Sequence, residues 1–284
     1  MLRDVYIKCR DRLKSGGIEA PDFEARCILE FVTGYDRTAQ LIHCKDVLPE
    51  EKKQLVNSIT EKRSSRYPLQ YLLHSWDFMG FPLSVGEGVL IPRDDTEVCV
   101  RLCLEYLKDK PNAEAIDLCS GSGAIAIALE KLGRAKTTAV EYSDEAFIFL
   151  KKNIKQNNCL INAVKGDIFI CHTEFPDNAF DLIVSNPPYI RRSELPTLQA
   201  EVLFEPKTAL DGGEDGLDFY RAIIRDWTPK LKKGGALVFE LGEDQAETVG
   251  EMMIKHGFEN IRTETDFGGC ERAIIGFLAL SSGR

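Results

Sequence analysis

The residues with the clearest potential for chemistry lie in the stretch 180–190, where an apolar, β-branched run leads into Asn186-Pro187-Pro188-Tyr189. The run is typical of a strand buried on both faces of a parallel sheet, and the prolines end it because they cannot donate to a strand ladder. Asn186 precedes a proline and is therefore restricted to an extended backbone. The pattern predicts a stiff turn at the carboxyl end of a strand, where open α/β sheets bind their ligands.

The chemistry that this turn could perform is narrow. The side-chain carbonyl of Asn186 and the backbone carbonyl of Pro187 could accept two hydrogen bonds from one planar NH2 group, and the Tyr189 ring could lie against its flat face. We therefore expect Asn186, Pro187 and Tyr189 to be catalytic, and all four residues of the turn, Pro188 included, to bind an amide or an exocyclic amine. The alternative is a strand-ending turn without chemistry.

Three earlier segments of the chain end in residues that suit a nucleotide-like ligand. The turn Cys119-Ser120-Gly121-Ser122-Gly123 joins a predicted strand to a predicted helix, and its glycines would let the backbone approach a ligand closely. It does not match the dinucleotide pattern G-x-G-x-x-G, so it is a weak signal by itself. Glu141 ends the next strand, where an acidic side chain can bind ribose hydroxyls, and Asp167 ends the third, where it can accept from an adenine amino group.

The elements that must position these residues follow from periodicity and from Gly and Pro punctuation. Residues 1–72 are expected to form a bundle of short helices that docks a substrate, and residues 73–100 a β-hairpin linker and the entry to a helix. Residues 101–284 are expected to form the catalytic domain, in which strands and helices alternate from Ala113 onward, as in a parallel sheet with crossover helices. A helix near 217–232 should stop at Gly234-Gly235, and the segments 259–265 and 272–280 should form an antiparallel hairpin.

Composition excludes several classes of protein. The 284 residues carry a net charge of −9, with +2 in residues 1–72 and −11 in the remainder. A body of that charge is poorly suited to nucleic acid, so direct nucleic-acid binding is not expected. There is no apolar run of membrane-spanning length and no signal peptide, which favours a cytoplasmic protein. Nine scattered cysteines and four histidines show no ligand spacing, so we expect no metal site.

Taken together, the motifs resemble those of the bacterial peptide chain release factor glutamine methyltransferases, the HemK/PrmC family. The resemblance covers nearly the whole chain, and it is carried by VLIPRDDTE, DLCSGSGAIAIAL, GDIF, SNPPYI and FEPKTALDGGEDGLDFYRAI. The sequence departs from the family at Cys119, where Gly is frequent, at Glu141, where Asp is common, and at Ile168, where Trp is frequent.

The resemblance implies a class I S-adenosylmethionine-dependent methyltransferase fold, an α/β domain with a seven-stranded mixed sheet, behind a small all-helical N-terminal domain. It implies methylation of the side-chain amide nitrogen of the glutamine in the Gly-Gly-Gln loop of release factors, with S-adenosyl-L-homocysteine as the second product. Alternatives are another protein glutamine (as in a ribosomal protein), a nucleic-acid base, or a docking module that binds the cofactor without turnover. The implied cofactor-binding residues are Asp117, Cys119, Ser120, Gly121, Ser122, Gly123, Glu141, Asp167, Ile168 and Asn186.

Overall fold

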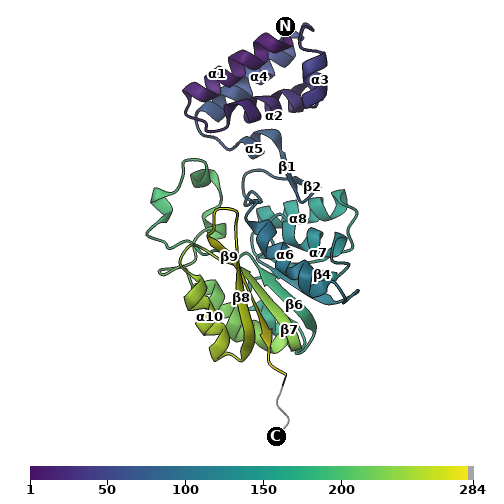
Figure 1. Cartoon of the computed structure of the whole chain (residues 1–284), viewed down its shortest axis with the longest axis vertical. Helices are drawn as coiled ribbons and strands as arrows, with labels where there is room; N and C mark the ends of the chain where they lie inside the picture. The colour runs from purple at the N-terminus through teal and green to yellow at the C-terminus, as the bar shows by residue number, and fades with distance from the viewer. Residues whose placement is uncertain (281–284) are drawn as a thin grey trace. The chain divides into compact units, whose positions relative to one another are not determined.

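A computed structural model of the chain describes residues 1–280 (Figure 1). They divide into two compact units, which are described here one by one. Unit 1 consists of residues 1–75 together with 199–204, and unit 2 of the remainder of the chain. None of the helices in the described residues is both long and apolar enough to cross a membrane.

Unit 1 is a bundle of short helices with its own apolar core. Its elements are α1 (Leu2–Ser15), α2 (Pro21–Thr33), α3 (Arg37–Ile42), α4 (Glu50–Ser64) and α5 (Leu69–Leu73). Pro21 opens α2 at a position where its missing N–H is harmless, and Gly34 ends that helix with a left-handed backbone at φ 77°. The core side chains recur at helical spacing, as Val5, Cys9 and Leu13 do on α1.

A buried arginine holds the separate segment 199–204 in unit 1. The Arg63 guanidinium donates to both carboxylate oxygens of Glu24, at 2.6 and 3.0 Å, and to Glu201 Oε1 at 3.0 Å. Its side chain is only 7% exposed, so its charge is compensated by these two carboxylates instead of by water. The segment that contributes Glu201 is thereby part of the helical unit although it lies far along the chain.

Unit 2 contains a two-stranded hairpin and a seven-stranded mixed sheet. The hairpin pairs β1 (Ser75–Phe78) with β2 (Phe81–Ser84), and its turn residues Met79 and Gly80 both have positive φ, which matches the twist of a tight hairpin. The sheet has the order β5-β4-β3-β6-β7-β9-β8. Its strands are β3 (Glu114–Leu118), β4 (Lys136–Glu141), β5 (Asn162–Lys165), β6 (Phe180–Ser185), β7 (Leu231–Glu240), β8 (Phe258–Thr265) and β9 (Glu271–Leu278).

Five neighbouring strands of the sheet, β5, β4, β3, β6 and β7, are parallel to one another. Strand β9 runs antiparallel to both β7 and β8. Alternate side chains of β6 enter two different cores: Leu182 packs with one cluster and Ile183 with the other. The first cluster holds residues of α6 (Thr96–Leu107), α7 (Ala124–Lys131) and α8 (Asp144–Gln156), and the second holds residues of α9 (Asp218–Ala222) and α10 (Ala246–Lys255) (Figure 1). Helices therefore cover both faces, as continuous apolar strands require.

The expected α/β class, the seven-stranded mixed sheet and the helical N-terminal unit are confirmed. The expected helix over 217–232 is present as a helical segment, but only its first turn is α-helical. After α9 the chain continues as a π-helix at Ile223–Trp227 and a 3₁₀ helix at Thr228–Lys230, which contains Pro229, and β7 begins at Leu231. Gly234 and Gly235 do not stop a helix. They lie inside β7, where the pairing with β6 shifts register, and Gly234 has φ 75°.

Candidate active site

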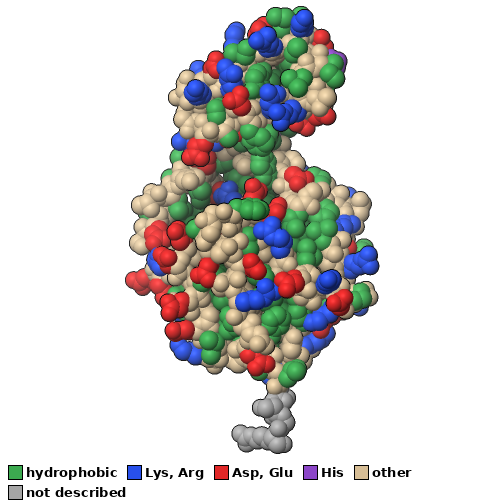
Figure 2. Space-filling view, in the orientation of Figure 1, with side chains coloured by type: hydrophobic (Ala, Val, Ile, Leu, Met, Phe, Trp, Pro, Cys, Tyr) green, Lys and Arg blue, Asp and Glu red, His purple; other side chains and the backbone are tan. Residues whose placement is uncertain are grey.

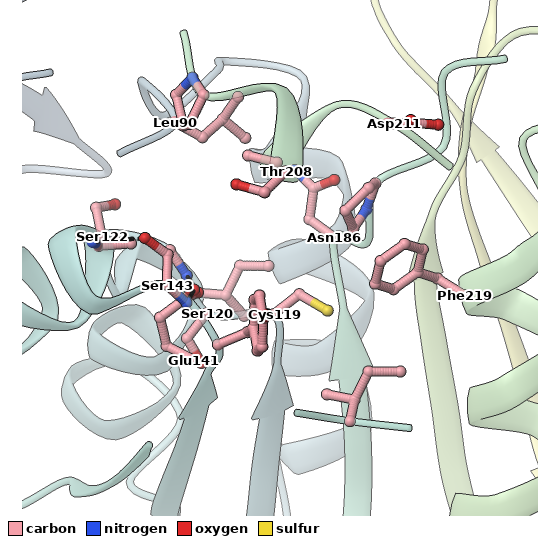
Figure 3. Close-up of a pocket in the computed structure, with 18 of the residues that line it drawn as sticks. Leu90, Cys119, Ser120, Ser122, Glu141, Ser143, Asn186, Thr208, Asp211 and Phe219 are labelled. Atoms are coloured by element: carbon pink, nitrogen blue, oxygen red, sulfur yellow. Dashed lines mark hydrogen bonds between the residues drawn. The ribbon is translucent and has the colours of Figure 1, made fainter. Parts of the chain in front are cut away.

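The predicted strand ends meet at one cavity of about 440 Å3 inside unit 2 (Figure 3). Cys119 follows β3, Glu141 ends β4, Asp167 follows β5 and Asn186 follows β6, and all four line the cavity. The cavity is also lined by Ser120, Gly121, Ser122 and Ile168 and by Pro188 of the proline turn. Four of the expected site residues are not part of its lining: Asp117, Gly123, Pro187 and Tyr189.

The loop after β3 turns sharply because three of its residues have positive φ: Cys119 (61°), Gly121 (54°) and Gly123 (84°). The two glycines serve different purposes. A Cβ added at Gly121 would meet no atom within 4 Å, so this glycine borders open space where a ligand can approach the backbone. A Cβ at Gly123 would lie 2.6 Å from Leu150 Cδ1, so that glycine permits α7 and α8 to pack closely.

Glu141 connects this loop to the turn that follows β4. Its Oε2 accepts a hydrogen bond from Gly121 N at 2.7 Å, and its Oε1 accepts one from Ser143 N at 2.6 Å. Burial raises the pKa of Glu141, and these two backbone donors lower it again because they stabilise the carboxylate. In Figure 3 the side chain lies beside Ser120 and Ser143 on one side of the cavity, and each of its oxygens keeps a further lone pair for a ligand.

Asp117 lies beneath the same loop, fully buried. Its Oδ2 accepts from Ala126 N at 3.2 Å in the first turn of α7, and its Oδ1 has no partner among the described residues. Burial raises its pKa to about 8. Because Asp117 does not line the cavity, its visible role is to hold the start of α7 from below.

The residues after β5 form an aromatic side of the cavity that the sequence analysis did not identify. Asp167 Oδ1 accepts from Phe169 N at 2.9 Å, and the carbonyl of Ile168 accepts from Trp227 Nε1 at 3.0 Å. Phe169 and Phe219 both line the cavity and contact each other edge to face with ring centroids 5.0 Å apart. The aromatic that ends the GDIF motif was the available signal for Phe169, whereas no local pattern marked Phe219.

Asn186 projects into the cavity from the end of β6, with Cys119, Ser120 and Glu141 on the other side (Figure 3). Its Nδ2 donates to Thr96 Oγ1 at 3.3 Å, which leaves Oδ1 as the end of the amide that can accept a hydrogen bond. Thr96 is buried and also lines the cavity. It stands in the IPRDDTE stretch, to which the sequence analysis assigned no role.

The rest of the proline turn is held from behind. The Tyr189 hydroxyl donates to Glu240 Oε1 at 3.4 Å, and the Tyr189 carbonyl accepts from Gln245 Nε2 at 3.0 Å. The backbone of Gly212 packs so closely that an added Cβ would lie 2.7 Å from Tyr189 Cα and 2.8 Å from the Pro188 carbonyl oxygen. The turn is therefore fixed between two other segments of unit 2.

A buried carboxylate, Glu205, connects the segment 89–97 to the segment 205–219. Glu205 is almost fully buried; its Oε2 accepts from Ile91 N at 3.0 Å, and its Oε1 pairs with Arg93. Burial raises the pKa of Glu205 and the Arg93 cation lowers it, so the pair compensates a buried charge. Both segments contribute to the lining of the cavity: Pro92, Arg93, Thr96, Pro206, Thr208, Ala209, Asp211, Gly213, Asp218 and Phe219.

Comparison with known proteins gives a consistent result. The family model for the PrmC N-terminal domain matches residues 4–73, and that for the methyltransferase small domain matches residues 92–216. The chain is 39% identical over 278 residues to the release factor glutamine methyltransferase of Geobacter sulfurreducens, with 97% of this chain and 96% of the relative covered. The chain belongs to the release factor glutamine methyltransferase family. The corresponding protein of Clostridium botulinum is 34% identical over 278 residues, with 96% of this chain and 98% of the relative covered.

Solved structures support the fold of this family member. A methyltransferase from Pyrococcus furiosus has a TM-score of 0.53 at 21% identity, and the match covers 71% of this chain and 91% of that protein. At this identity the likeness concerns the fold alone. The chain thus has the α/β methyltransferase fold that the sequence implied, and it is a methyltransferase by family.

Proposed function

We propose that this protein transfers the methyl group of S-adenosyl-L-methionine to the side-chain amide nitrogen of the glutamine in the Gly-Gly-Gln loop of peptide chain release factors. Membership in the family supports this activity. The observation that carries the proposal is the orientation of Asn186: its NH2 end is engaged by Thr96, so that its oxygen remains available to a substrate NH2 group. Both lie on the cavity that also contains Glu141.

The residues around the cavity fit this cofactor. A volume of about 440 Å3 lies in the range of small-molecule sites, and open space at Gly121 leaves the backbone of the glycine turn accessible. Glu141 has lone pairs for the two ribose hydroxyls, and Asp167 can accept from the adenine amino group. Cys119, Ser120 and Ser122 would border the remainder, with Ile168 beside the base. When bound, S-adenosyl-L-methionine supplies a methyl group activated by its positively charged sulfur.

The acceptor is a poor nucleophile, because resonance ties up the lone pair of an amide nitrogen. A carboxylate cannot remove its proton at neutral pH, since the two pKa values lie too far apart. The proton leaves after the nitrogen has been methylated and has become strongly acidic. The protein must therefore act through position and electrostatics.

Two hydrogen bonds from the substrate NH2, to Asn186 Oδ1 and to the Pro187 carbonyl, would strengthen as positive charge grows on the nitrogen. Bonds of this charge-assisted type contribute about 3–6 kcal/mol together. Alignment of the nitrogen with the methyl group contributes more, roughly 7–11 kcal/mol, which is why a rigid turn suits the task. Tyr189 supports that turn from behind through its contacts to Glu240 and Gln245.

We further propose that residues 1–72 dock the release factor. In support, unit 1 has its own core and exposes several large apolar side chains at its surface: Phe23, Phe31, Leu41, Ile42 and Val47. Isolated apolar residues on a surface are ordinary, but Leu41 and Ile42 are adjacent at the end of α3 and both exposed, which favours a partner-binding role for that end of the helix.

The proposed activity is tested by mass spectrometry of a purified release factor after incubation with the enzyme and S-adenosyl-L-methionine. The loop glutamine should become heavier by one methyl group, and a release factor with alanine at that position should remain unmodified. Methylation of DNA or RNA in place of the protein would refute the proposal. The visible face of unit 2 in Figure 2 mixes acidic and basic side chains and shows no continuous basic surface, which favours the protein substrate.

A further inference from the structure

Glu240, the last residue of β7, is a carboxylate to which the mechanism above gives no role beyond its contact with Tyr189. It is 2% exposed and lies below the proline turn. Its Oε1 accepts from the Tyr189 hydroxyl at 3.4 Å, and its Oε2 has no hydrogen-bond partner of regular geometry among the described residues. The Tyr220 hydroxyl donates to the Glu240 main-chain oxygen at 2.8 Å, which fixes the end of the strand. A buried acidic group in this position requires an explanation.

Thr96 connects Glu240 to Asn186. Its hydroxyl oxygen accepts a hydrogen bond from Asn186 Nδ2 at 3.3 Å. The same hydroxyl lies close enough to the Glu240 carboxylate to lower the pKa of that group, although the two make no hydrogen bond of regular geometry in this structure. A hydroxyl has a single proton to donate. When that proton points to the carboxylate, which can only accept, the oxygen of Thr96 is left to accept from Asn186.

The direction of the hydrogen bonds from Asn186 through Thr96 to Glu240 decides which end of the Asn186 amide faces the cavity. The oxygen and the NH2 group of an asparagine have nearly the same shape, so a half-turn of the amide changes its chemistry without changing its packing. With Nδ2 bound to Thr96, Oδ1 can accept from a substrate NH2 group. The reversed amide would present NH2 to NH2 and would bind no amide nitrogen.

We infer that Glu240, acting through Thr96, is the positioning residue that orients the Asn186 amide for the methyl-acceptor nitrogen. Glu240 itself contacts no substrate. The inference rests on the proposed role of Asn186 as acceptor. It explains why an acidic residue is buried at the end of β7, where an apolar side chain would fill the space without a desolvation penalty.

The charge on Glu240 should therefore matter. Burial raises its pKa to about 7. A protonated carboxyl can donate to Thr96, and the hydrogen bonds can then run in the opposite direction, with the Asn186 amide reversed. The ionised form is the competent one, so kcat should decline as the pH falls through about 7. The titratable or charged groups that face it are Asp95 just before α6, Cys99 on α6, Tyr189 of the turn, Tyr220 on α9 and Arg272 on β9.

Three variants test the hydrogen-bonded connection from Glu240 through Thr96 to Asn186. Thr96→Val has the same shape without the hydroxyl, Thr96→Ser keeps the hydroxyl, and Glu240→Gln places an NH2 donor where the carboxylate was. Loss of an oriented hydrogen bond in the transition state should lower kcat roughly 10- to 100-fold in Thr96→Val and Glu240→Gln. Thr96→Ser should restore kcat to within about threefold. Thr137→Val is the matched control, because Thr137 is equally buried but lies at the amino end of β4, opposite the site.

Four further measurements separate orientation of the amide from general damage to the fold. The affinity for S-adenosyl-L-homocysteine, measured by calorimetry, and the melting temperature should stay near the wild-type values in Thr96→Val. In an Asn186→Ala background, Thr96→Val should lower kcat no further, because the amide that it orients is absent. In wild-type protein the decline of kcat below about pH 7 should be present, and in Thr96→Val it should be lost.

The possible results decide between the two proposals. If Asn186→Ala abolishes turnover while Thr96→Val keeps wild-type kcat, the role of Glu240 is refuted and the proposed function stands. If Asn186→Ala itself turns over normally, the role of Asn186 fails and the inference fails with it. Full additivity of Thr96→Val and Asn186→Ala would also overturn the inference. Should Glu240→Gln fail to fold, the comparison of Thr96→Val with Thr96→Ser still decides.

Discussion

Replacement of Glu141 by glutamine should weaken the binding of S-adenosyl-L-homocysteine roughly 10- to 150-fold. Both carboxylate oxygens already accept from backbone donors, Gly121 N at 2.7 Å and Ser143 N at 2.6 Å. A glutamine keeps one oxygen and turns an NH2 group toward the other donor. At that position a ribose hydroxyl of the ligand would lose its hydrogen bond to a charged group, and such a bond contributes about 1.5–3 kcal/mol, which corresponds to this range of affinity.

Calorimetric titration of the wild-type protein and the variant measures this effect directly. Glu145→Gln is the matched control: the residue is exposed on α8, bonds to the Ser143 hydroxyl and does not line the cavity. Its affinity for S-adenosyl-L-homocysteine should equal that of the wild type. Melting temperatures of both variants establish that the sheet is intact.

A 2′-deoxy analogue of the ligand separates direct ribose binding from organisation of the loop. If Glu141 holds the ribose, removal of the hydroxyl should reduce affinity for the wild-type protein by much more than for Glu141→Gln. An equal reduction in both proteins would mean that Glu141 only fixes the glycine turn. An unchanged affinity of the folded variant for S-adenosyl-L-homocysteine would refute the reasoning altogether.

Three further outcomes are expected. Tyr189→Phe loses only the 3.4 Å hydrogen bond to Glu240 and should keep kcat within about threefold of the wild type. Tyr189→Ala removes the ring that supports the turn and should lower both kcat and the melting temperature. Equal kcat values in the two variants would contradict this role of the ring. The raised pKa of Asp117, about 8, means that the fold binds its proton more tightly than the unfolded chain, so this contribution to stability is lost as pH rises toward 8. The free energy of unfolding, measured with denaturant, should fall by on the order of 2–3 kcal/mol between pH 5.5 and 8 in the wild type, and Asp117→Asn should largely abolish this fall. The same pH dependence in both proteins would exclude a contribution from Asp117. Leu41→Ser combined with Ile42→Ser should raise KM for the release factor without altering affinity for S-adenosyl-L-homocysteine, and an unchanged KM would contradict docking through that surface.

The fold, and the site residues at the carboxyl ends of the strands, could be predicted because they depend on local patterns. In a parallel sheet the carboxyl ends of the strands share one edge, so a glycine turn, Glu141, Asp167 and Asn186 at four successive strand ends had to lie near one another. The structure brings these residues to one cavity. No long-range information was needed beyond the alternation of strands and helices.

The walls of the site could not be predicted in the same way. Glu205 lies between two short 3₁₀ turns and Gly212 in the irregular stretch before α9, and hydrophobic periodicity cannot place either of them. Thr96 and Glu240 approach each other from elements 144 positions apart in the chain. The failure at Gly234-Gly235 has a related cause, since a glycine pair can end a helix or form a bulge, and only the pairing of β7 with β6 decides between them.

Buried acids with raised pKa near a cavity often serve as proton donors or acceptors, and this site contains four of them, Asp117, Glu141, Glu205 and Glu240. Asp117 and Glu240 do not line the cavity, and methylation of an amide needs no base before the methyl group moves. Each instead lies beside a donor that must be held in one direction: Asp117 accepts from the first turn of α7, and Glu240 accepts from the Tyr189 hydroxyl and has the Thr96 hydroxyl nearby. For Glu240 an ionised carboxylate suits that task because it offers acceptors alone, whereas an amide or a hydroxyl in its place could reverse the direction of the hydrogen bonds. Asp117, whose pKa of about 8 keeps it protonated at neutral pH, accepts through its Oδ2 alone. In a reaction governed by position, the buried charge at the end of β7 therefore acts through geometry, and its protonation should lower turnover without any proton passing through it.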